Sequence, residues 1–244
     1  MRPVRRGASP LATDYEDYRD AKPDLVSRLG PYCSFCERKI STQLAVEHIQ
    51  PKGIAAYSHL IGNWENFLLA CVNCNSTKKD KNVILANYYL PDRDNTLSTF
   101  TYLQNGQINP SPRLSQRKKA IANRTLKLVG LDKPIVSTLD ENGVLIALDR
   151  KSQRMEAWLS ADLAKQQIDN DPGNNSLKAM AIMLAQASGF FSIWLTVFDN
   201  DQDMKNRLVS AFPGTRQSGC FDPTTAALVL PSPNHDALID GSKA

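Results

Sequence analysis

Two short stretches of the same form, Cys33-Ser34-Phe35-Cys36 and Cys71-Val72-Asn73-Cys74, decide the fold of the segment between them. Each stretch turns tightly enough for its two thiolates to bind one ion, and four thiolates complete a tetrahedral zinc site. Such a site leaves no open position for water, so any chemistry needs other residues. The sequence therefore predicts a structural zinc ion bound by Cys33, Cys36, Cys71 and Cys74.

Two disulfides or a redox-active dithiol are the alternative interpretations of these cysteines. Disulfides are uncommon in a reducing cytoplasm, and one redox motif does not explain its duplicate. A bound zinc ion supplies on the order of 10 kcal/mol of folding free energy, which lets a short segment with few apolar residues hold a rigid shape. Cys220 is the unpaired fifth cysteine and is predicted to be an inert buried thiol.

The segment between the cysteine pairs predicts strand, loop, strand and helix. Leu44 to Ile49 form the first strand, which ends at Gln50-Pro51-Lys52-Gly53, and Asn66 to Ala70 form the second. A helix is expected to start at Asn75. Polar side chains thus gather near the ends of these elements, where the buried runs stop.

This order and spacing resemble the HNH endonuclease family, whose core is a ββα-metal finger. The resemblance rests on Val46-Glu47-His48-Ile49-Gln50-Pro51-Lys52, on Asn63-Trp64-Glu65-Asn66-Phe67-Leu68-Leu69-Ala70, and on Cys71-Val72-Asn73-Cys74-Asn75-Ser76-Thr77-Lys78. It covers residues 33–78, including the zinc-binding cysteines found in many members. The fold class that follows is α+β and mainly α: a zinc-stapled ββα-metal (HNH) finger with flanking helices and an α-helical C-terminal region.

The resemblance implies a role for each polar residue of the finger. His48 is the general base that takes a proton from the attacking water. Glu47 and Asn75 are ligands of a catalytic divalent ion, magnesium or manganese. Asn66 braces the loop and hydrogen-bonds the His48 imidazole. Glu47 stands where Asp or His is commoner in the family, and Asn75 stands where many members have a second His.

Elementary chemistry is consistent with these roles. A histidine with an ordinary pKa near 6.5 is partly neutral at cellular pH and accepts a proton. Magnesium prefers oxygen ligands such as a carboxylate and an amide. A lone strand histidine is more often structural, but His48 stands beside Glu47 and between the cysteine pairs. Four lysines flank the proposed site and are predicted to contact nucleic-acid phosphates, with solvated surface lysines as the alternative: Lys52, Lys78, Lys79 and Lys81.

The whole chain has the composition of a globular protein. It has 244 residues, of which 42% are hydrophobic and 22% charged, enough for one large domain or two small ones. Residues 1–134 hold 20 Lys or Arg and 12 Asp or Glu, a net charge of +8, whereas the remainder holds 9 and 13, a net of −4. A basic first half favours an anionic partner such as nucleic acid.

Periodicity and turn residues predict the organisation outside the finger. Residues 1–112 are expected to form the nuclease domain, with an N-terminal arm and the zinc site, and residues 113–244 a mainly helical C-terminal domain for partner docking. A hairpin is predicted within residues 91–112, turning at Asn105-Gly106. Helices are predicted over residues 14–29 with an interruption near Pro23, then over 113–129, 149–170, 176–198 as a pair split at Gly189, and 202–212.

One stretch has the length of a membrane span. Ala179 to Phe198 carries no charge over twenty residues. It contains several polar residues and alanines, and Gly189 divides it, so a pair of buried core helices is favoured over a span. The basic first residues lead into no apolar stretch, so no secretory signal is predicted, and a cytoplasmic location without membrane association is expected.

Two further stretches resemble the HNH component of the Septu anti-phage systems, some of which are associated with retrons. They are the start, Met1-Arg2-Pro3-Val4, and the late run Trp194-Leu195-Thr196-Val197-Phe198 with Phe212-Pro213-Gly214-Thr215. That resemblance implies a role in anti-phage defence and a partner, an ATPase of the ABC/SMC type. The leading interpretation is a metal-dependent endonuclease acting on nucleic acid, with DNA favoured and RNA, including transfer RNA, as the other substrate. A non-catalytic zinc-finger adaptor and a thiol-disulfide enzyme are the alternatives.

Overall fold

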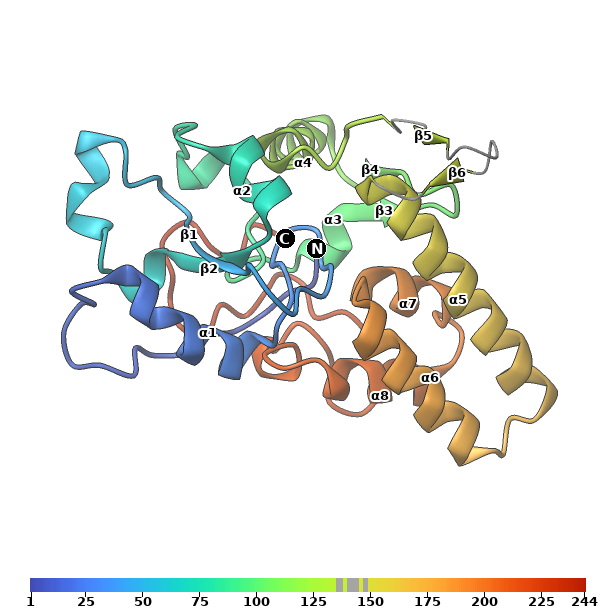
Figure 1. The fold of residues 1–244 in the computed structure, drawn as a ribbon. Helices are drawn as coiled ribbons and strands as arrows, with labels where there is room; N and C mark the ends of the chain where they lie inside the picture. The colour runs from blue at the N-terminus through green and yellow to red at the C-terminus, as the bar shows by residue number, and fades with distance from the viewer. Residues whose placement is uncertain (135–137, 140–144, 147–148) are drawn as a thin grey trace.

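A computed structural model describes residues 1–134, 138–139, 145–146 and 149–244. The predicted ββα unit lies in the left half of the molecule as drawn in Figure 1. Strands β1 (Ala45–His48) and β2 (Phe67–Ala70) pair antiparallel, with His48 opposite Phe67. All four residues of β2 are buried, because an apolar strand is covered on both faces. Helix α2 (Val72–Lys78) follows directly.

Helix α2 starts earlier than predicted. Its N-cap is Cys71, so the second cysteine pair forms the first turn of the helix. Asn75, expected at the helix start, therefore lies in the helix interior, one turn before Lys78. The helix ends where Lys79 adopts φ 47°.

The finger is flanked by the N-terminal helices and by a hairpin. The predicted helix over residues 14–29 begins later, as η1 (Tyr18–Ala21) and α1 (Lys22–Leu29), because Pro23 suits the first turn of a helix and not its interior. The predicted hairpin is β3 (Phe100–Tyr102) with β4 (Ile108–Pro110), preceded by α3 (Thr96–Thr99). Short 3-10 turns are η2 (Ala55–Leu60), η3 (Trp64–Asn66), η4 (Leu85–Asn87) and η5 (Arg216–Ser218).

Five longer helices and a small strand pair follow the hairpin. Helix α4 (Gln116–Val129) ends at Gly130 in the left-handed conformation, as predicted. Strands β5 (Thr138–Leu139) and β6 (Leu145–Ile146) precede α5 (Arg150–Asn170). Helices α6 (Asn175–Ser188), α7 (Phe191–Val197) and α8 (Gln202–Ala211) complete the C-terminal region, where the long α5 and α6 lie side by side (Figure 1). The mixed, mainly helical fold class is confirmed.

The apolar stretch over residues 179–198 breaks at Gly189, as predicted. Its two halves differ in burial, since α7 lies in the core whereas α6 leaves Met180 and Met183 exposed. The prediction of two buried helices is therefore right for α7 and wrong for much of α6. Within the residues that the structure describes, no helix is long and apolar enough to cross a membrane.

The hydrophobic core has two clusters. The first surrounds the finger and includes α4 through residues such as Leu126 and Val129. The second joins α5, α6, α7 and α8. The predicted boundary between residues 112 and 113 does not separate these clusters, because α4 packs with the finger. The division into a nuclease domain and a docking domain stays a prediction.

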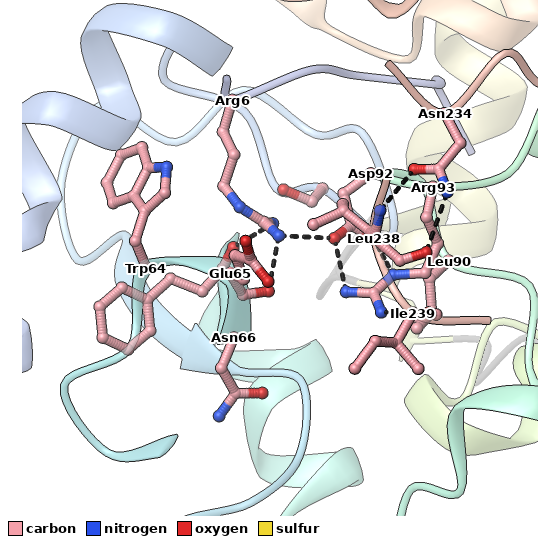
Figure 2. Close-up of polar contacts among 12 residues, drawn as sticks. Arg6, Trp64, Glu65, Asn66, Leu90, Asp92, Arg93, Asn234, Leu238 and Ile239 are labelled. Atoms are coloured by element: carbon pink, nitrogen blue, oxygen red, sulfur yellow. Dashed lines mark hydrogen bonds and ion pairs between the residues drawn. The ribbon is translucent and has the colours of Figure 1, made fainter. Parts of the chain in front are cut away.

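A buried ionic network holds the N-terminal arm against the finger (Figure 2). The Arg6 guanidinium donates to the backbone carbonyls of Glu65 and Phe67 and pairs with Asp92 at 2.9 Å. Arg93 also pairs with Asp92, at 2.9 Å. The arm thus fixes the backbone on both sides of Asn66. Sequence analysis did not single out this network, because its members lie far apart in the chain.

The Asp92→Asn variant is expected to lose about 3–5 kcal/mol of unfolding free energy at pH 7, because two buried guanidinium groups lose their counter-charge. Burial by itself raises the pKa of Asp92, but Arg93 and Arg6 outweigh it and hold the pKa at about 2, below the ordinary 3.8. The stabilising contribution is therefore present above pH 3.8 and is lost as the pH falls through about 2. Urea unfolding measures the effect.

The matched control is Asp169→Asn, which removes an exposed carboxylate on α5 that is paired with Lys165. An exposed i,i+4 pair contributes only about 0.3–0.5 kcal/mol. Equal stabilities of the Asp92 and Asp169 variants would contradict the importance assigned to the network.

Candidate functional site

The four paired cysteines converge on one point. Their Sγ atoms all lie within 4.8 Å of one another, all four side chains are buried, and none forms a disulfide. The Sγ atoms of Cys36 and Cys71 are 3.7 Å apart. Four thiolates bound to a tetrahedral ion at the zinc–sulfur distance of about 2.3 Å lie about 3.8 Å apart. The residues present therefore fit a zinc ion.

Cations surround the cysteine cluster. The Arg150 guanidinium donates to the Cys74 sulfur at 3.1 Å from the start of α5. Four thiolates on a divalent ion carry a net charge of −2, so a nearby guanidinium offsets part of the cost of burying that charge. This contact also ties the C-terminal helices to the finger. Cys220 lies outside the cluster, buried, and burial raises the pKa of its thiol.

His48 lies at the end of β1 with its ring held on three sides. Its Nε2 atom is 2.9 Å from the Ile61 carbonyl oxygen. The rings of Tyr18 and Phe67 pack against it edge to face, at 4.7 and 5.3 Å between centroids. A carbonyl only accepts, so the contact assigns the proton to Nε2 and leaves Nδ1 with a free lone pair.

Burial lowers the pKa of His48, the Ile61 hydrogen bond opposes that shift, and the cations Lys52 and Lys78 lower the pKa further. The net direction is below the ordinary value of 6.5. The imidazole is therefore neutral at pH 7. Among the residues that the structure describes, Nδ1 has no hydrogen-bond partner, so it is free to accept a proton from a ligand.

Asn66 acts on the loop and not on the imidazole. Its Oδ1 accepts from the Gln50 N–H at 2.8 Å, and its Nδ2 donates to the carbonyls of Gln50 and Leu60. The expected hydrogen bond from Asn66 to His48 is not made, since the Ile61 carbonyl takes that place. By fixing Leu60, Asn66 positions the neighbouring carbonyl of Ile61 and hence the ring of His48.

Glu47 is buried and paired with Lys78. The Lys78 ammonium lies 2.8 Å from Glu47 Oε1 and donates to the His48 carbonyl at 2.7 Å. Burial raises the pKa of Glu47, and Lys78 opposes this rise. Lys78 is only 1% exposed. Its predicted phosphate contact is therefore corrected, because α2 docks on β1 and turns this lysine inward.

The oxygen donors fit a hard cation in kind. Only Oε1 of Glu47 pairs with Lys78, and Oε2 makes no hydrogen bond to the described part of the chain. Asn75 is half-buried on α2, one turn before Lys78, so the two residues share a helix face. A carboxylate oxygen and an amide oxygen are ligands that magnesium accepts. Glu47 and Asn75 are the residues of the finger that would hold the ion.

The other predicted phosphate-binding lysines are exposed. Lys52 donates to the Tyr18 hydroxyl at 2.8 Å and lies over the Tyr18 ring, which itself contacts His48. Lys79 follows α2 and faces solvent. Lys81 donates to the Lys127 and Leu128 carbonyls at the end of α4. These three side chains lie around the finger and stay candidates for phosphate contact.

The Lys78→Met variant is expected to lose about 3–5 kcal/mol of unfolding free energy, because it leaves the buried Glu47 carboxylate without a counter-charge. Adding Glu47→Gln to Lys78→Met should recover part of that loss, since the double variant buries no unpaired charge. The neighbouring exposed Lys79→Met is the control and should stay within about 0.5 kcal/mol of the wild type. Thermal and urea unfolding measure these three variants and the single Glu47→Gln variant, and additivity of the Lys78→Met and Glu47→Gln effects would refute the pairing.

The sequence did not predict two groups that contact His48, the Ile61 carbonyl and the Tyr18 ring. The Ile61 carbonyl is a backbone group, so no side-chain pattern reveals it. Tyr18 contacts His48 from η1, some thirty residues earlier in the chain. The burial of Lys78 had a signal in the sequence. Lys78 follows Asn75 by three residues, and this spacing places it on the same helix face as the predicted metal ligand.

Comparison with known proteins agrees with this geometry. Residues 32–81 match the family model of the HNH endonuclease. The chain therefore carries an HNH endonuclease domain, formed by the cysteine cluster, β1, β2 and α2. It is also similar to a protein of Vibrio cholerae serotype O1 biovar El Tor named "Retron Vc95 putative HNH endonuclease". The two are 29% identical over 144 residues, which cover 53% of this chain and 68% of the relative.

Proposed function

We propose that this protein is a metal-dependent endonuclease that hydrolyses phosphodiester bonds of nucleic acid, with DNA as the favoured substrate. The observation that carries the proposal is the state of His48. Its Nε2 is committed to the Ile61 carbonyl, its pKa is lowered, and its Nδ1 is free to act as a base. A merely structural histidine needs no free nitrogen of this kind.

In the proposed mechanism, Nδ1 of His48 takes a proton from the water that attacks the scissile phosphate. The Ile61 carbonyl stabilises the imidazolium that forms, because it accepts a hydrogen bond from the Nε2–H group. Glu47 and Asn75 would hold a magnesium ion, which would supply stabilisation of the negative charge on the phosphate and the leaving oxygen. Lys78 holds Glu47 in place through its ion pair, and Asn66 positions the loop that carries Ile61.

The test is cleavage of plasmid DNA and of a transfer RNA by the purified full chain, with magnesium or manganese and with chelator. Cleavage that requires the added ion supports the proposal, and the preferred substrate shows whether DNA is favoured. A non-catalytic zinc-finger adaptor predicts binding without cleavage under every condition. If cleavage is absent, the assay is repeated with a candidate partner ATPase of the ABC/SMC type, and absence there as well refutes the endonuclease.

We also propose that the protein acts in the cytoplasm as the effector of an anti-phage defence system and docks an ATPase of the ABC/SMC type through its C-terminal helices. The name of the similar Vibrio cholerae protein supports a retron context. The exposed apolar residues of α5 and α6 support docking, since large apolar side chains on a surface favour protein contact: Leu159, Leu163, Met180, Met183 and Leu184. Co-expression of the two proteins followed by size-exclusion chromatography tests the partnership, and Met183→Glu should weaken it.

A further inference from the structure

The outer surface of α4 carries a row of cations that the proposed mechanism does not use. Arg117, Arg124 and Lys127 are exposed, and their spacing of seven and three residues places them along one face of the helix. Between Asp94 and Asp132 the sequence contains no acidic residue. This face therefore carries positive charge with no acidic neighbour on its own helix.

A shallow groove connects this row to the finger. The groove lies where the C-terminal end of α4 meets α2, and four lysines and one aspartate line it, together with Ser76, Thr77 and Gly130. The charged residues are Lys79, Lys81, Lys127, Lys133 and Asp132. The charged lining thus has a net charge of +3, which concentrates an anionic ligand.

Helices α2 and α4 pack against each other at this groove, and the loop after α4 adds a further contact. Lys133 Nζ lies 3.4 Å from the Thr77 hydroxyl of α2, and Figure 1 shows α2 beside α4. Lys79 is the residue after Lys78, which contacts the candidate site. The groove therefore includes the residue that directly follows the partner of Glu47.

The end of α4 is itself neutralised. The last carbonyls of a helix carry partial negative charge and would repel a phosphate. Here Lys81 donates to the carbonyls of Lys127 and Leu128, and Arg150 donates to those of Val129 and Gly130, at 2.8 and 2.5 Å. The carbonyl end of the helix is thus covered by cations, which makes it compatible with an anionic ligand.

We propose that the phosphodiester backbone of the substrate continues from the finger through the α2–α4 groove and along α4, where Arg117, Arg124 and Lys127 bind phosphates away from the scissile bond. This inference rests on the proposed function and adds an extended binding surface. Arg117 and Lys127 are ten residues apart, about 15 Å along the helix. At about 3.4 Å of rise per phosphate on one strand, that span covers about four phosphates of a duplex.

The experiment measures binding of a 30-base-pair DNA duplex to the full chain by fluorescence anisotropy, in chelator and at several salt concentrations. The triple variant Arg117→Gln, Arg124→Gln and Lys127→Gln should bind more weakly. The slope of log K against log salt should fall in magnitude by about 2 to 3, since each lost phosphate contact removes about 0.9. Arg124 also donates to the Asn87 carbonyl, so its replacement could disturb the structure. The double variant Arg117→Gln and Lys127→Gln avoids this contact, and its salt slope should fall in magnitude by about 2.

The control removes the same charge from α5 and α8, through Lys165→Gln, Lys205→Gln and Arg207→Gln. Its slope should match that of the wild type. Equal slopes for the α4 triple variant and this control would overturn the inference. The proposed function would stay intact in that case if the wild-type protein still binds and cleaves the duplex. A wild-type protein that neither binds nor cleaves the duplex, alone or with its partner ATPase, overturns both.

Discussion

Replacing His48 by glutamine is expected to lower the rate of phosphodiester cleavage by roughly 10²–10⁴-fold, the usual contribution of a positioned general base. Glutamine keeps an N–H that can donate to the Ile61 carbonyl, but it has no nitrogen that accepts a proton at neutral pH. The variant thus tests the base and not the hydrogen bond. Single-turnover cleavage of a labelled duplex, with enzyme in excess, measures the chemical step.

Two controls separate the lost base from a damaged fold. His59→Gln changes the exposed histidine of η2 and should cleave at the wild-type rate. The metal content and the melting temperature of His48→Gln should match the wild type, since the cysteine cluster is untouched. Cleavage by His48→Gln within tenfold of the wild-type rate would remove His48 as the base, and another group would then have to activate the water.

Replacing Cys71 by serine is expected to release the bound metal and unfold the finger. Structural zinc sites bind with about 10–16 kcal/mol in zinc-finger peptides, an amount comparable to the whole stability of a domain. Cys71 is the N-cap of α2 without a capping side-chain hydrogen bond, and serine is itself a favoured N-cap residue, so the change tests the lost metal ligand and not the cap. Elemental analysis should fall from one zinc per chain toward none, and hydrogen exchange should lose protection over residues 32–81.

Cys220→Ser is the matched control, because Cys220 is equally buried but lies outside the cluster. It should keep one zinc per chain and protection of the finger. A Cys71→Ser protein that retains its zinc and its protection would show that the cluster does not staple the fold. Absence of zinc from the wild-type protein, with reactive thiols in its place, would instead favour the thiol-disulfide enzyme.

Much of the fold is predictable where its signals are local. The two C-x-x-C turns, the strand that ends at His48, and the break at Gly189 each depend on a few consecutive residues. Their positions agree with the structure to within a few residues. The one systematic difference is at helix starts, where Cys71 and Pro23 shift α2 and α1 relative to the periodic pattern.

The spacing of residues along the chain did not predict the environments of Lys78, Lys79 and Asn66. Lys78 and Lys79 are neighbours of the same type, yet one is buried against Glu47 and the other faces solvent. Asn66 lies in the expected place but bonds Gln50 and Leu60. In both cases the partner lies more than five residues away, and only the docking of helix and loop on the strand selects it.

By itself, the sequence determined that four sulfurs can meet around a small hairpin and that a histidine follows a glutamate at its end. Those features depend on backbone turns and on strand and helix periods, which act over a few residues. The tertiary structure alone decided which nitrogen of His48 is free, which cation neutralises Glu47, and that α4 lies beside α2. Protonation, ion pairing and surface charge depend on groups within a few ångströms in space, and folding brings those groups together from distant parts of the chain.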